Sequence, residues 1–424
     1  MESKKNKVNN RKRSWLYVFI VISIIGVIGC VYLFNNKRNL DKGNVVELIV
    51  NNKFDEAKTQ CDKLLNENKK NYLVYNYRAF IEFELDMKDK AYEDLKKSIE
   101  IEDNENQLAY GVKAYFQLKD GDVEGAKKSV ENSKNIKASD EFEQFILGSL
   151  YANTSDKNKA IDYFNLAIDK NKNYSRAFSS RGEVYLALKE NEKALKDFET
   201  AISLDKENYY GVSGKIKALV SMKEYDKAIE LGESSLKNAK TKNVDLLYSL
   251  ISAYTHGKDY DRLLNLGEDL IKNNKSFEGY FYKGWAYYNL SQYNKAIEAF
   301  DKTIKINDRD SSSYNIKAWC YSALKKYKEA KNDFKKAIEI NERYFDAYRG
   351  LAWAHNNLNE QDESIKVCEK ALELDRNNAN LYACLGWNYL DKKDYKKAQE
   401  NFEKSLSINK EDVDAKNGMK LINK

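Results

Sequence analysis

Small and large apolar residues recur along this chain at intervals of 33 to 35 residues. In most periods a small residue is followed four positions later by a large apolar one, and three positions after that by another small one. Two clear examples are Ala160, Phe164, Ala167 and Ala330, Phe334, Ala337. Positions i, i+4 and i+7 share one face of a helix. The pattern predicts a helix whose small residues let a second helix approach closely.

A second apolar stripe precedes the first in each period. It comprises Tyr348, Leu351, Ala352 and His355 in one period, and Tyr382, Leu385, Gly386 and Tyr389 in the next. Each period is therefore a hairpin of two amphipathic helices, which is too small to bury its apolar face alone and must stack on its neighbours. The chain is predicted to be an all-α solenoid rather than a set of globular domains.

This pattern resembles the tetratricopeptide repeat family, whose 34-residue units carry an aromatic, Leu-Gly, Tyr, Ala, Phe and Ala pattern. Residues 345–378 follow it almost position for position, and about eleven units cover residues 38–412. The units start near Arg38, Tyr72, Gln107, Glu141, Ser175, Tyr209, Val244, Phe277, Ser311, Phe345 and Ala379. The resemblance implies a right-handed α-solenoid of helix-turn-helix units.

Three features depart from the family pattern. The proline that ends the second helix is missing, because the chain has no proline, and Asn, Asp and Lys are expected to close these turns instead. Gly232 and Gly267 replace the large aromatic residue, which predicts loose packing and a bend between residues 225 and 275. The first unit is poorly matched, as expected of a terminal unit. Residues 413–424 are predicted to form a polar capping helix with Met419 and Leu421 turned inward.

The N-terminal 34 residues differ from the rest. Residues 1–14 hold six basic residues and one acidic residue, and residues 15–34 carry no charge. A helix of 20 residues spans about 30 Å, the thickness of the hydrocarbon core of a bilayer. We expect residues 15–34 to form one transmembrane helix or signal anchor. The basic tail then lies in the cytoplasm and the repeats lie outside the cell membrane.

A lipid anchor is the alternative to the retained helix. Val27, Ile28, Gly29 and Cys30 resemble the lipobox of bacterial lipoproteins, in which cleavage before the cysteine leaves a lipidated N-terminus. The apolar run continues beyond Cys30 to Phe34, which favours the retained helix. Both alternatives place the repeats on the outer face of a bacterial membrane.

Charge and motifs argue against several classes of function. Subtracting the basic tail from the totals of 72 basic and 66 acidic residues leaves 66 and 65, so the concentrated basic surface that nucleic-acid binding requires is missing. The two histidines, His256 and His355, lie about 100 residues apart, and no G-x-S-x-G, H-E-x-x-H or P-loop motif occurs. We expect no catalytic residue, metal site or cofactor. Cys368 and Cys384 fall on adjacent predicted helices and could pair in an oxidising compartment.

Tryptophans mark the candidate binding surface. Beyond the first 34 residues they occur only at the ninth position of the last four units, as Trp285, Trp319, Trp353 and Trp387. The family resemblance places positions 2, 5, 9 and 12 on a concave groove. Repeated aromatic faces desolvate readily and suit a peptide or a sugar ring. The alternative is that these tryptophans pack against the neighbouring unit.

Other residues extend this candidate groove. The predicted partner-binding set is Trp285, Trp319, Trp353, Trp387, Phe281, Tyr288, Arg349 and Asn356. An earlier aromatic stretch occupies the same positions, at Phe80, Phe83, Tyr115, Phe142 and Phe145. Between the two we expect a polar floor of Ser179, Glu183, Ser213, Lys217, Ser252 and Thr255. The asparagine of a chaperone-type carboxylate clamp is not in place.

The resemblance therefore implies a membrane-anchored scaffold that binds extended segments of envelope or secreted proteins, without catalysis. Two alternatives remain open from the residues. One is a cell-wall glycan-binding protein that uses the tryptophans as a stacking platform. The other is a regulatory module for a membrane enzyme.

Overall fold

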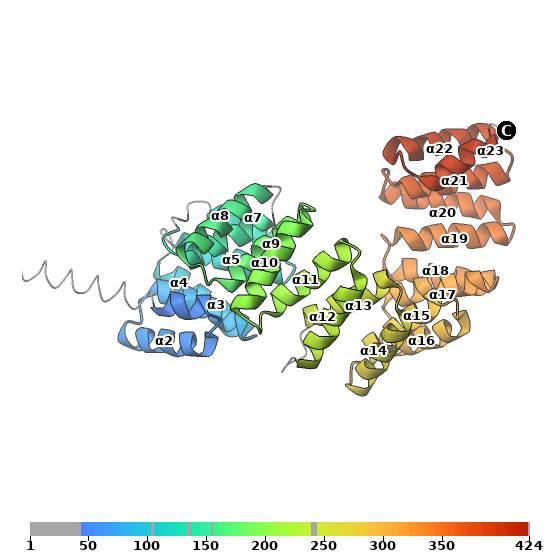
Figure 1. The fold of residues 1–424 in the computed structure, drawn as a ribbon. Helices are drawn as coiled ribbons and strands as arrows, with labels where there is room; N and C mark the ends of the chain where they lie inside the picture. The colour runs from blue at the N-terminus through green and yellow to red at the C-terminus, as the bar shows by residue number, and fades with distance from the viewer. Residues whose placement is uncertain are drawn as a thin grey trace, which may run out of the picture. The chain divides into compact units, whose positions relative to one another are not determined.

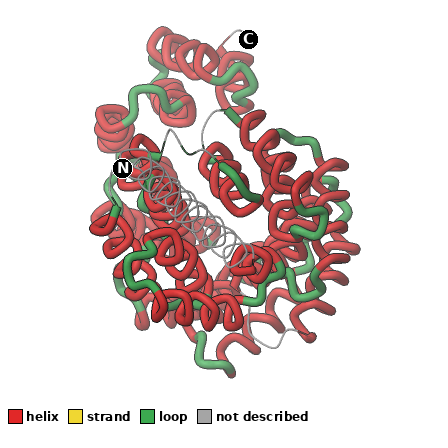
Figure 2. Tube along the Cα trace, turned by 90° about the vertical axis from the view of Figure 1, so that its left-hand side faces the viewer, coloured by secondary structure: helices red, strands yellow, loops and turns green. Residues whose placement is uncertain are grey.

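A computed structural model of the chain describes residues 44–102, 106–133, 136, 138–153, 156–238 and 244–422. These residues form helices joined by turns, and they contain no strand (Figures 1 and 2). The predicted basic tail (1–14), the predicted membrane segment (15–34) and Cys30 lie outside them. Within the described ranges no helix is both long and apolar enough to cross a bilayer.

The chain divides into two compact units, residues 1–253 and 254–424. In the first unit residues 44–50 are helical. The helices that follow them are α2 (Phe54–Glu67), α3 (Tyr72–Glu84), α4 (Lys88–Ile101), α5 (Gln107–Lys119), α6 (Val123–Asn132), α7 (Glu141–Ala152), α8 (Lys157–Lys170), α9 (Ser175–Ala187), α10 (Asn191–Leu204), α11 (Tyr209–Ser221), α12 (Tyr225–Asn238) and α13 (Val244–Gly257), which crosses the boundary.

The second unit continues the same pattern. Its helices are α14 (Tyr260–Lys272), α15 (Ser276–Asn289), α16 (Tyr293–Ile306), α17 (Ser311–Ala323), α18 (Tyr327–Ile340), α19 (Phe345–Asn357), α20 (Gln361–Leu374), α21 (Ala379–Asp391), α22 (Tyr395–Ile408) and α23 (Val413–Ile422). Within each unit, most helices pack against the next one in sequence, and first helices of successive repeats also touch, as α9 and α11 or α19 and α21 do. Both units are therefore stacks of helical hairpins.

Helix starts follow the period read from the sequence. The helices α3, α5, α7, α9, α11, α13, α17, α19 and α21 begin at the predicted residue, and α15 begins one residue earlier, at Ser276. Met419 and Ile422 of α23 pack against the last repeat, whereas Leu421 is 51% exposed. The prediction that Leu421 turns inward is wrong, because Ala415, Met419 and Ile422 already form the inward stripe at helical spacing.

The large aromatic residue of a second helix locks two first helices together. Phe198 on α10 is fully buried, with Gly182 on α9 and Gly214 on α11 against its ring. A Cβ atom on Gly182 would lie 2.8 Å from the ring, and one on Gly214 would be closer still. The small residues thus allow the close approach that the sequence pattern predicted.

Gly232 and Gly267 do not leave the packing loose. A Cβ atom on Gly232 would lie 2.7 Å from the Leu250 side chain, and one on Gly267 would lie 2.9 Å from the carbonyl oxygen of Gly279. Neighbouring groups occupy the space of the absent side chains, so the prediction of loose packing is wrong. The unit boundary after Ala253 falls inside the predicted range of 225–275, and the bend itself stays a prediction.

Asparagine and aspartate close the turns between repeats in place of proline. The residue after a second helix accepts a hydrogen bond from the backbone N–H two residues later, as Asn341 does from Arg343 at 3.0 Å. A second such residue then caps the next helix, as Asn378 does by accepting from the N–H of Leu381 at 3.3 Å. This agrees with the expectation for a chain without proline.

The turn inside a hairpin places the fifteenth residue of the repeat in the left-handed region. Nine residues other than glycine have φ between 56° and 62° at this position: Asn52, Asp86, Lys189, Lys223, Lys258, Ser291, Lys325, Asn359 and Lys393. Gly121 occupies the same position with φ of 81°. Only glycine adopts this conformation without steric cost.

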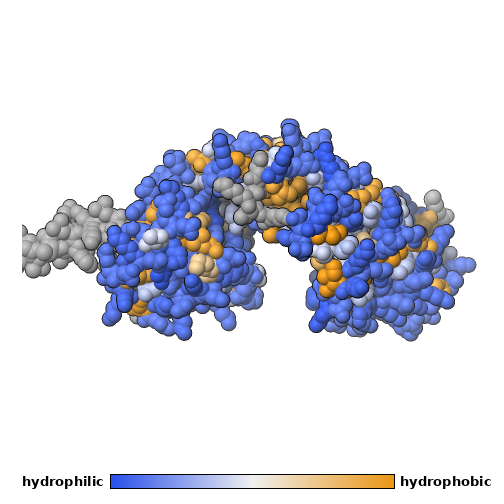
Figure 3. All heavy atoms as spheres, turned by 90° about the horizontal axis from the view of Figure 1, so that it is seen from below, coloured by the Kyte–Doolittle hydropathy of each residue, from blue (hydrophilic) through white to orange (hydrophobic). Residues whose placement is uncertain are grey.

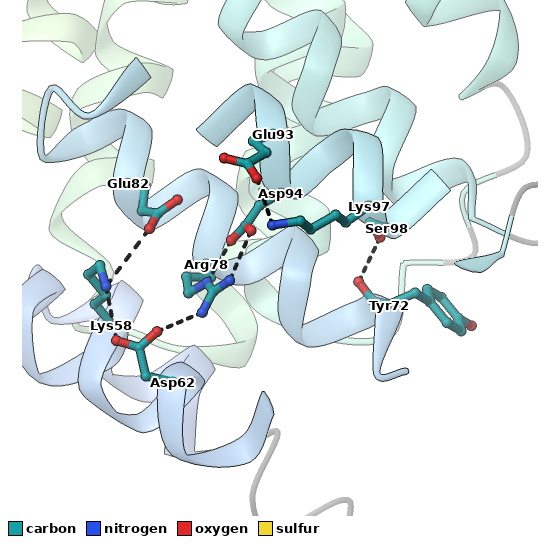
Figure 4. A network of polar contacts seen from close by, with 9 residues as sticks. All are labelled: Lys58, Asp62, Tyr72, Arg78, Glu82, Glu93, Asp94, Lys97 and Ser98. Atoms are coloured by element: carbon teal, nitrogen blue, oxygen red, sulfur yellow. Dashed lines mark hydrogen bonds and ion pairs between the residues drawn. The ribbon is translucent and has the colours of Figure 1, made fainter. Parts of the chain in front are cut away.

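A basic residue at the seventh position of the repeat connects successive second helices. Figure 4 shows Arg78 on α3 between Asp62 on α2, at 2.7 Å, and Asp94 on α4, at 2.6 Å. Each partner lies 16 residues from Arg78 in the sequence. The same spacing recurs in the trios Asn165, Arg181, Asp197 and Asp301, Lys317, Asp333. Charge pairing thus reinforces the apolar contacts between neighbouring repeats.

Candidate partner-binding site

The four tryptophans predicted to line a groove have different surroundings in the second unit. Trp353 on α19 is 39% exposed, and its ring centre lies 6.1 Å from that of Trp319 on α17. Tyr327 on α18 meets the Trp353 ring edge-on at 5.4 Å. Trp319 is half-buried and packs edge-on against Phe334 at 5.1 Å. These contacts hold the exposed indole of Trp353 in one orientation.

The other two tryptophans pack within their own repeats. Trp285 stacks on Tyr288 at 5.9 Å, and Phe281 meets Phe300 edge-on at 5.9 Å. Trp387 packs edge-on against Phe402 at 5.7 Å. These three pairs of rings each lie against a buried apolar cluster, so packing explains why the residues are aromatic. The structure therefore brings Trp319 and Trp353 together and leaves Trp285 and Trp387 apart from them.

The carboxylate of Asp346, which the sequence analysis did not identify, accepts hydrogen bonds from residues of the site. Asp346 Oδ2 accepts hydrogen bonds from Trp319 Nε1 at 3.0 Å and from Asn315 Nδ2 at 2.9 Å, and Oδ1 lies 2.6 Å from Arg349 Nη2. Burial acts to raise the pKa of Asp346, but the bonds from Arg349, Asn315 and Trp319 outweigh it and lower the pKa. Asp346 is the second residue of its repeat, one of the groove positions, which was the signal available in the sequence.

Arg349 and Asn356 share helix α19 with Trp353, four residues before it and three residues after it. The Arg349 guanidinium lies over the Trp319 ring, 5.5 Å from its centre. Asn356 Nδ2 donates to Asn388 Oδ1 and lies 3.3 Å from Asp391 Oδ2, while Asn356 Oδ1 is buried without a partner among the described residues. The surface therefore combines an exposed indole, a half-exposed guanidinium and an amide, all from α19.

This combination suits a polypeptide segment. The indole offers an apolar face, the guanidinium is a donor to carbonyl or carboxylate oxygens, and aromatic and arginine side chains dominate the binding energy of many interfaces. In the view of Figure 3, hydrophilic residues cover most of the surface and apolar residues appear in small groups. Trp353 is the one tryptophan of the described residues that is exposed rather than half-buried.

The predicted aromatic groove of the first unit is wrong. Phe80, Phe142 and Phe145 are at most 1% exposed and Tyr115 is 5% exposed, and all belong to one continuous core. The Phe80 and Phe142 rings, from α3 and α7, lie 4.8 Å apart. Helices that are separated in sequence thus meet over these positions, and they fill the space that an open groove would need.

A nearly buried ion pair between Arg176 and Glu84 lies at this core. Arg176 on α9 donates through Nη2 to Glu84 Oε2 on α3, and the Tyr115 hydroxyl donates to Glu84 Oε1 at 3.1 Å. The Arg176 and Glu84 side chains are only 11% and 9% exposed. Four residues of the predicted polar floor, Ser179, Glu183, Ser213 and Lys217, line a pocket beside this pair, whereas Ser252 and Thr255 are not among its lining residues.

His355 occupies a packed position, as its register suggested. It is 6% exposed, and its Nδ1 atom lies 2.6 Å from Glu360 Oε2. Burial lowers the pKa of His355 in spite of the opposing effect of Glu360. Within the described ranges, no group of three or more His, Cys, Asp and Glu side chains could hold a metal ion.

Comparisons with known families agree with the period of the chain. Profiles described as tetratricopeptide repeat match residues 144–174, 175–208, 321–386 and 379–412. A profile described as anaphase-promoting complex, cyclosome, subunit 3 matches residues 256–337. No curated protein matches the chain.

Solved structures share the fold at low sequence identity. The crystal structure of yeast Tom70 has 14% identity, covers 91% of this chain and 94% of its own, and gives a TM-score of 0.50. A tetratricopeptide repeat protein from Parabacteroides merdae has 18% identity, covers 67% of this chain and 99% of its own, and gives 0.46. YrrB, described as a protein with an unusual peptide-binding site, has 17% identity, covers 61% and 97%, and gives 0.31.

Proposed function

Since the chain belongs to the tetratricopeptide repeat family, we propose that it is a non-catalytic scaffold that binds an extended segment of a partner protein. The binding surface is the Trp353 surface, which comprises Trp319, Asp346, Arg349, Trp353 and Asn356. The observation that carries this proposal is the 39% exposure of a Trp353 ring that Trp319 and Tyr327 hold in place. A held aromatic ring loses little conformational freedom on binding.

A peptide fits this surface better than a glycan does. A stacking platform for sugar rings needs several free indole faces, but Arg349 lies over Trp319, and the Trp319 N–H is already bonded to Asp346. Trp285 and Trp387 are half-buried within their own repeats. Trp353 alone would have to bind the sugar, so glycan binding is the second candidate.

We also propose that residues 15–34 anchor the scaffold in a bacterial cell membrane and hold the repeats outside it. The support is the uncharged run of 20 residues after a basic tail. Washing isolated membranes at alkaline pH tests this, and release of the chain would contradict it. A Cys30→Ser variant that leaves the membrane would assign the anchor to lipidation instead.

Selection of random displayed peptides on the full chain tests the binding function. We expect the selected peptides to lose at least about tenfold in affinity for a Trp353→Ser variant, because a central aromatic residue dominates such interfaces. Tyr395→Ser is the matched control, since Tyr395 is an equally accessible aromatic residue at 55% exposure on α22. Binding is measured by titration calorimetry.

Equal affinity for the Trp353→Ser and Tyr395→Ser variants would contradict the proposed surface. Cosedimentation with purified cell-wall glycan that requires Trp353, without any selected peptide, would instead favour the glycan reading.

A further inference from the structure

The first unit contains a pocket lined by both apolar and polar side chains. Its volume is about 400 Å³, and it lies among α5, α7, α8, α9, α11 and the start of α13. Its apolar wall comprises Leu118, Ala152 and Ala187, whose side chains are at least partly exposed. Charged and hydroxyl groups line the rest of it. A ligand that fills the pocket must therefore combine an apolar part with a polar one.

Lys119 is the cation of this pocket that lacks a counter-ion. Its ammonium lies 4.9 Å from the centre of the Tyr210 ring and 5.7 Å from that of Tyr115, and it forms no ion pair with any described residue. Two other cations of the pocket are already paired, Arg176 with Glu84 and Lys217 with Glu183. Asp245 also lines the pocket and forms no ion pair with a described residue. An anion would therefore have to bind at Lys119 and Arg176, away from this carboxylate.

Burial lowers the pKa of Lys119, and the nearby Arg176 acts in the same direction. The carboxylates of Glu84, Asp245 and Glu183 act in the opposite direction. An anion bound next to Lys119 would favour its charged form.

Two polar atoms of residues that line the pocket lack partners. Arg176 Nη1 and Ser213 Oγ are buried, and neither forms a hydrogen bond within the described part of the chain. Buried donors are almost always paired in native proteins. Both residues line the pocket, so small shifts of their side chains would bring these donors to an acceptor placed next to Lys119.

We infer that this pocket binds a carboxylate that is attached to an apolar or aromatic group. The carboxylate lies against Lys119 and Arg176, and the apolar group lies against Leu118, Ala152 and Ala187. An inorganic phosphate would leave the apolar wall uncovered. The site lies in the first unit and is separate from the Trp353 surface.

N-acetylphenylalanine and its neutral amide test this inference on the full chain by titration calorimetry. We expect the acid to bind and the amide to bind at least about tenfold more weakly. Lys119→Met should remove the preference for the acid and Lys119→Arg should keep it. Lys215→Met should leave binding unchanged, because Lys215 lies on the same helix as Ser213, is not among the residues that line the pocket and pairs with Glu199. Trp353→Ser should also have no effect, which separates this site from the proposed function.

Equal binding of the acid and the amide would overturn the inference, as would binding of the acid that does not depend on Lys119. Inorganic phosphate that binds as tightly as the acid would overturn the role of the apolar wall. Two peptides then identify the source of the carboxylate. One ends in a free phenylalanine carboxylate, and the other is amidated and carries an internal glutamate, so preference for the first assigns a chain end and preference for the second assigns a side chain.

A separate observation concerns two cysteines of the second unit. Cys368 Sγ on α20 and Cys384 Sγ on α21 lie 3.2 Å apart. Cys368 is buried, whereas Cys384 is partly exposed. A disulfide requires the sulfur atoms to approach to about 2.05 Å, which a small rotation of the two side chains can supply. The geometry points to a disulfide between Cys368 and Cys384, formed by exchange with a small disulfide such as oxidised glutathione.

The exchange is balanced in atoms and electrons. The Cys384 thiol loses its proton to solvent, and its thiolate attacks one sulfur of the oxidant, which releases one glutathione thiolate and forms a mixed disulfide. Cys368 then loses its proton and attacks Cys384 Sγ, which releases the second glutathione thiolate. The two electrons given up by the cysteines reduce the S–S bond of the oxidant, and the released thiolates take up protons.

Peptide mapping by mass spectrometry after incubation of the full chain with oxidised glutathione tests this step. We expect a cross-linked peptide pair that contains Cys368 and Cys384 and lacks two hydrogens, while the buried Cys61 and Cys320 stay reduced. A Cys368→Ser variant should retain glutathione on Cys384. A stable glutathione adduct on Cys384 of the unaltered chain, without the cross-link, would overturn the proposal.

Discussion

Replacing Arg176 with methionine is expected to lower the free energy of unfolding of the first unit by about 3–5 kcal/mol. The Arg176 guanidinium is the counter-charge of Glu84, which lies 92 residues away in the sequence and is almost completely buried. In the variant, Glu84 keeps only the Tyr115 hydroxyl, and a buried carboxylate without a counter-charge is costly. Methionine retains an unbranched apolar chain beside Phe80, so the loss arises mainly from the charge.

Two probes of urea unfolding locate this effect. Far-ultraviolet circular dichroism reports both units, whereas in a Trp15→Phe background every remaining tryptophan lies in the second unit. The circular dichroism transition of the first unit should move to lower urea concentration, and the fluorescence transition should keep its midpoint.

Control variants separate the buried charge from a general effect. Lys217→Met removes a pair with Glu183 that is 49% and 45% exposed, and should cost less than about 1 kcal/mol. Adding Glu84→Gln to Arg176→Met should recover much of the loss, because no charge is then left unpaired. Equal losses for Arg176→Met and Lys217→Met would show that the buried pair does not hold the first unit together.

Phe198→Ala is expected to lower the free energy of unfolding of the first unit by about 3–5 kcal/mol as well. Its fully buried ring on α10 contacts Gly182 on α9 and Gly214 on α11. Alanine leaves a cavity that neither glycine can fill, and it loosens two repeats at once. Urea unfolding followed by circular dichroism measures the change.

A matched control lies on the same helix. Leu204 ends α10 and is 38% exposed, so Leu204→Ala should stay within about 0.5 kcal/mol of the unaltered chain. Gly214→Ala should destabilise the unaltered chain, because its Cβ atom would meet the Phe198 ring, but should be tolerated in the Phe198→Ala background. If the losses of Gly214→Ala and Phe198→Ala were additive in the double variant, the proposed contact between the Phe198 ring and Gly214 would not stabilise the two repeats.

Local chemistry explains which parts of the fold were predictable. A helix start depends on nearby residues, such as the capping side chain of Asn378, and on a period repeated along the chain. The closure of turns by Asn and Asp follows from the absence of proline. These features require no knowledge of residues that are distant in sequence.

Contacts between distant repeats were not predictable in this way. Glu84 and Arg176 each look like an ordinary surface charge in their own repeat, and only the curvature of the stack brings them together. The same approach of α3 and α7 buries Phe80 and Phe142, which the period alone placed in a groove. Curvature accumulates small rotations over several repeats, so a single repeat does not reveal it.

The binding surface was predicted in part for the same reason. Trp353 is the ninth residue of its repeat, which the family resemblance places among the groove positions, and the structure leaves its side chain exposed. The register could not show that Asp346 would hold the Trp319 N–H, or that Trp285 and Trp387 would pack into their own repeats. Those outcomes depend on rotamers and on neighbouring helices.

The left-handed turns inside the hairpins give the chain an unused reserve of thermal stability. Nine residues other than glycine adopt this conformation, each at a steric cost of roughly 1 kcal/mol. Glycine would remove that cost but loses roughly 0.5–1 kcal/mol more backbone entropy on folding, so the gain at each turn is a fraction of the steric cost. Glycine substitutions at these turns could raise the thermal stability of the scaffold without a change to the pocket or to the Trp353 surface.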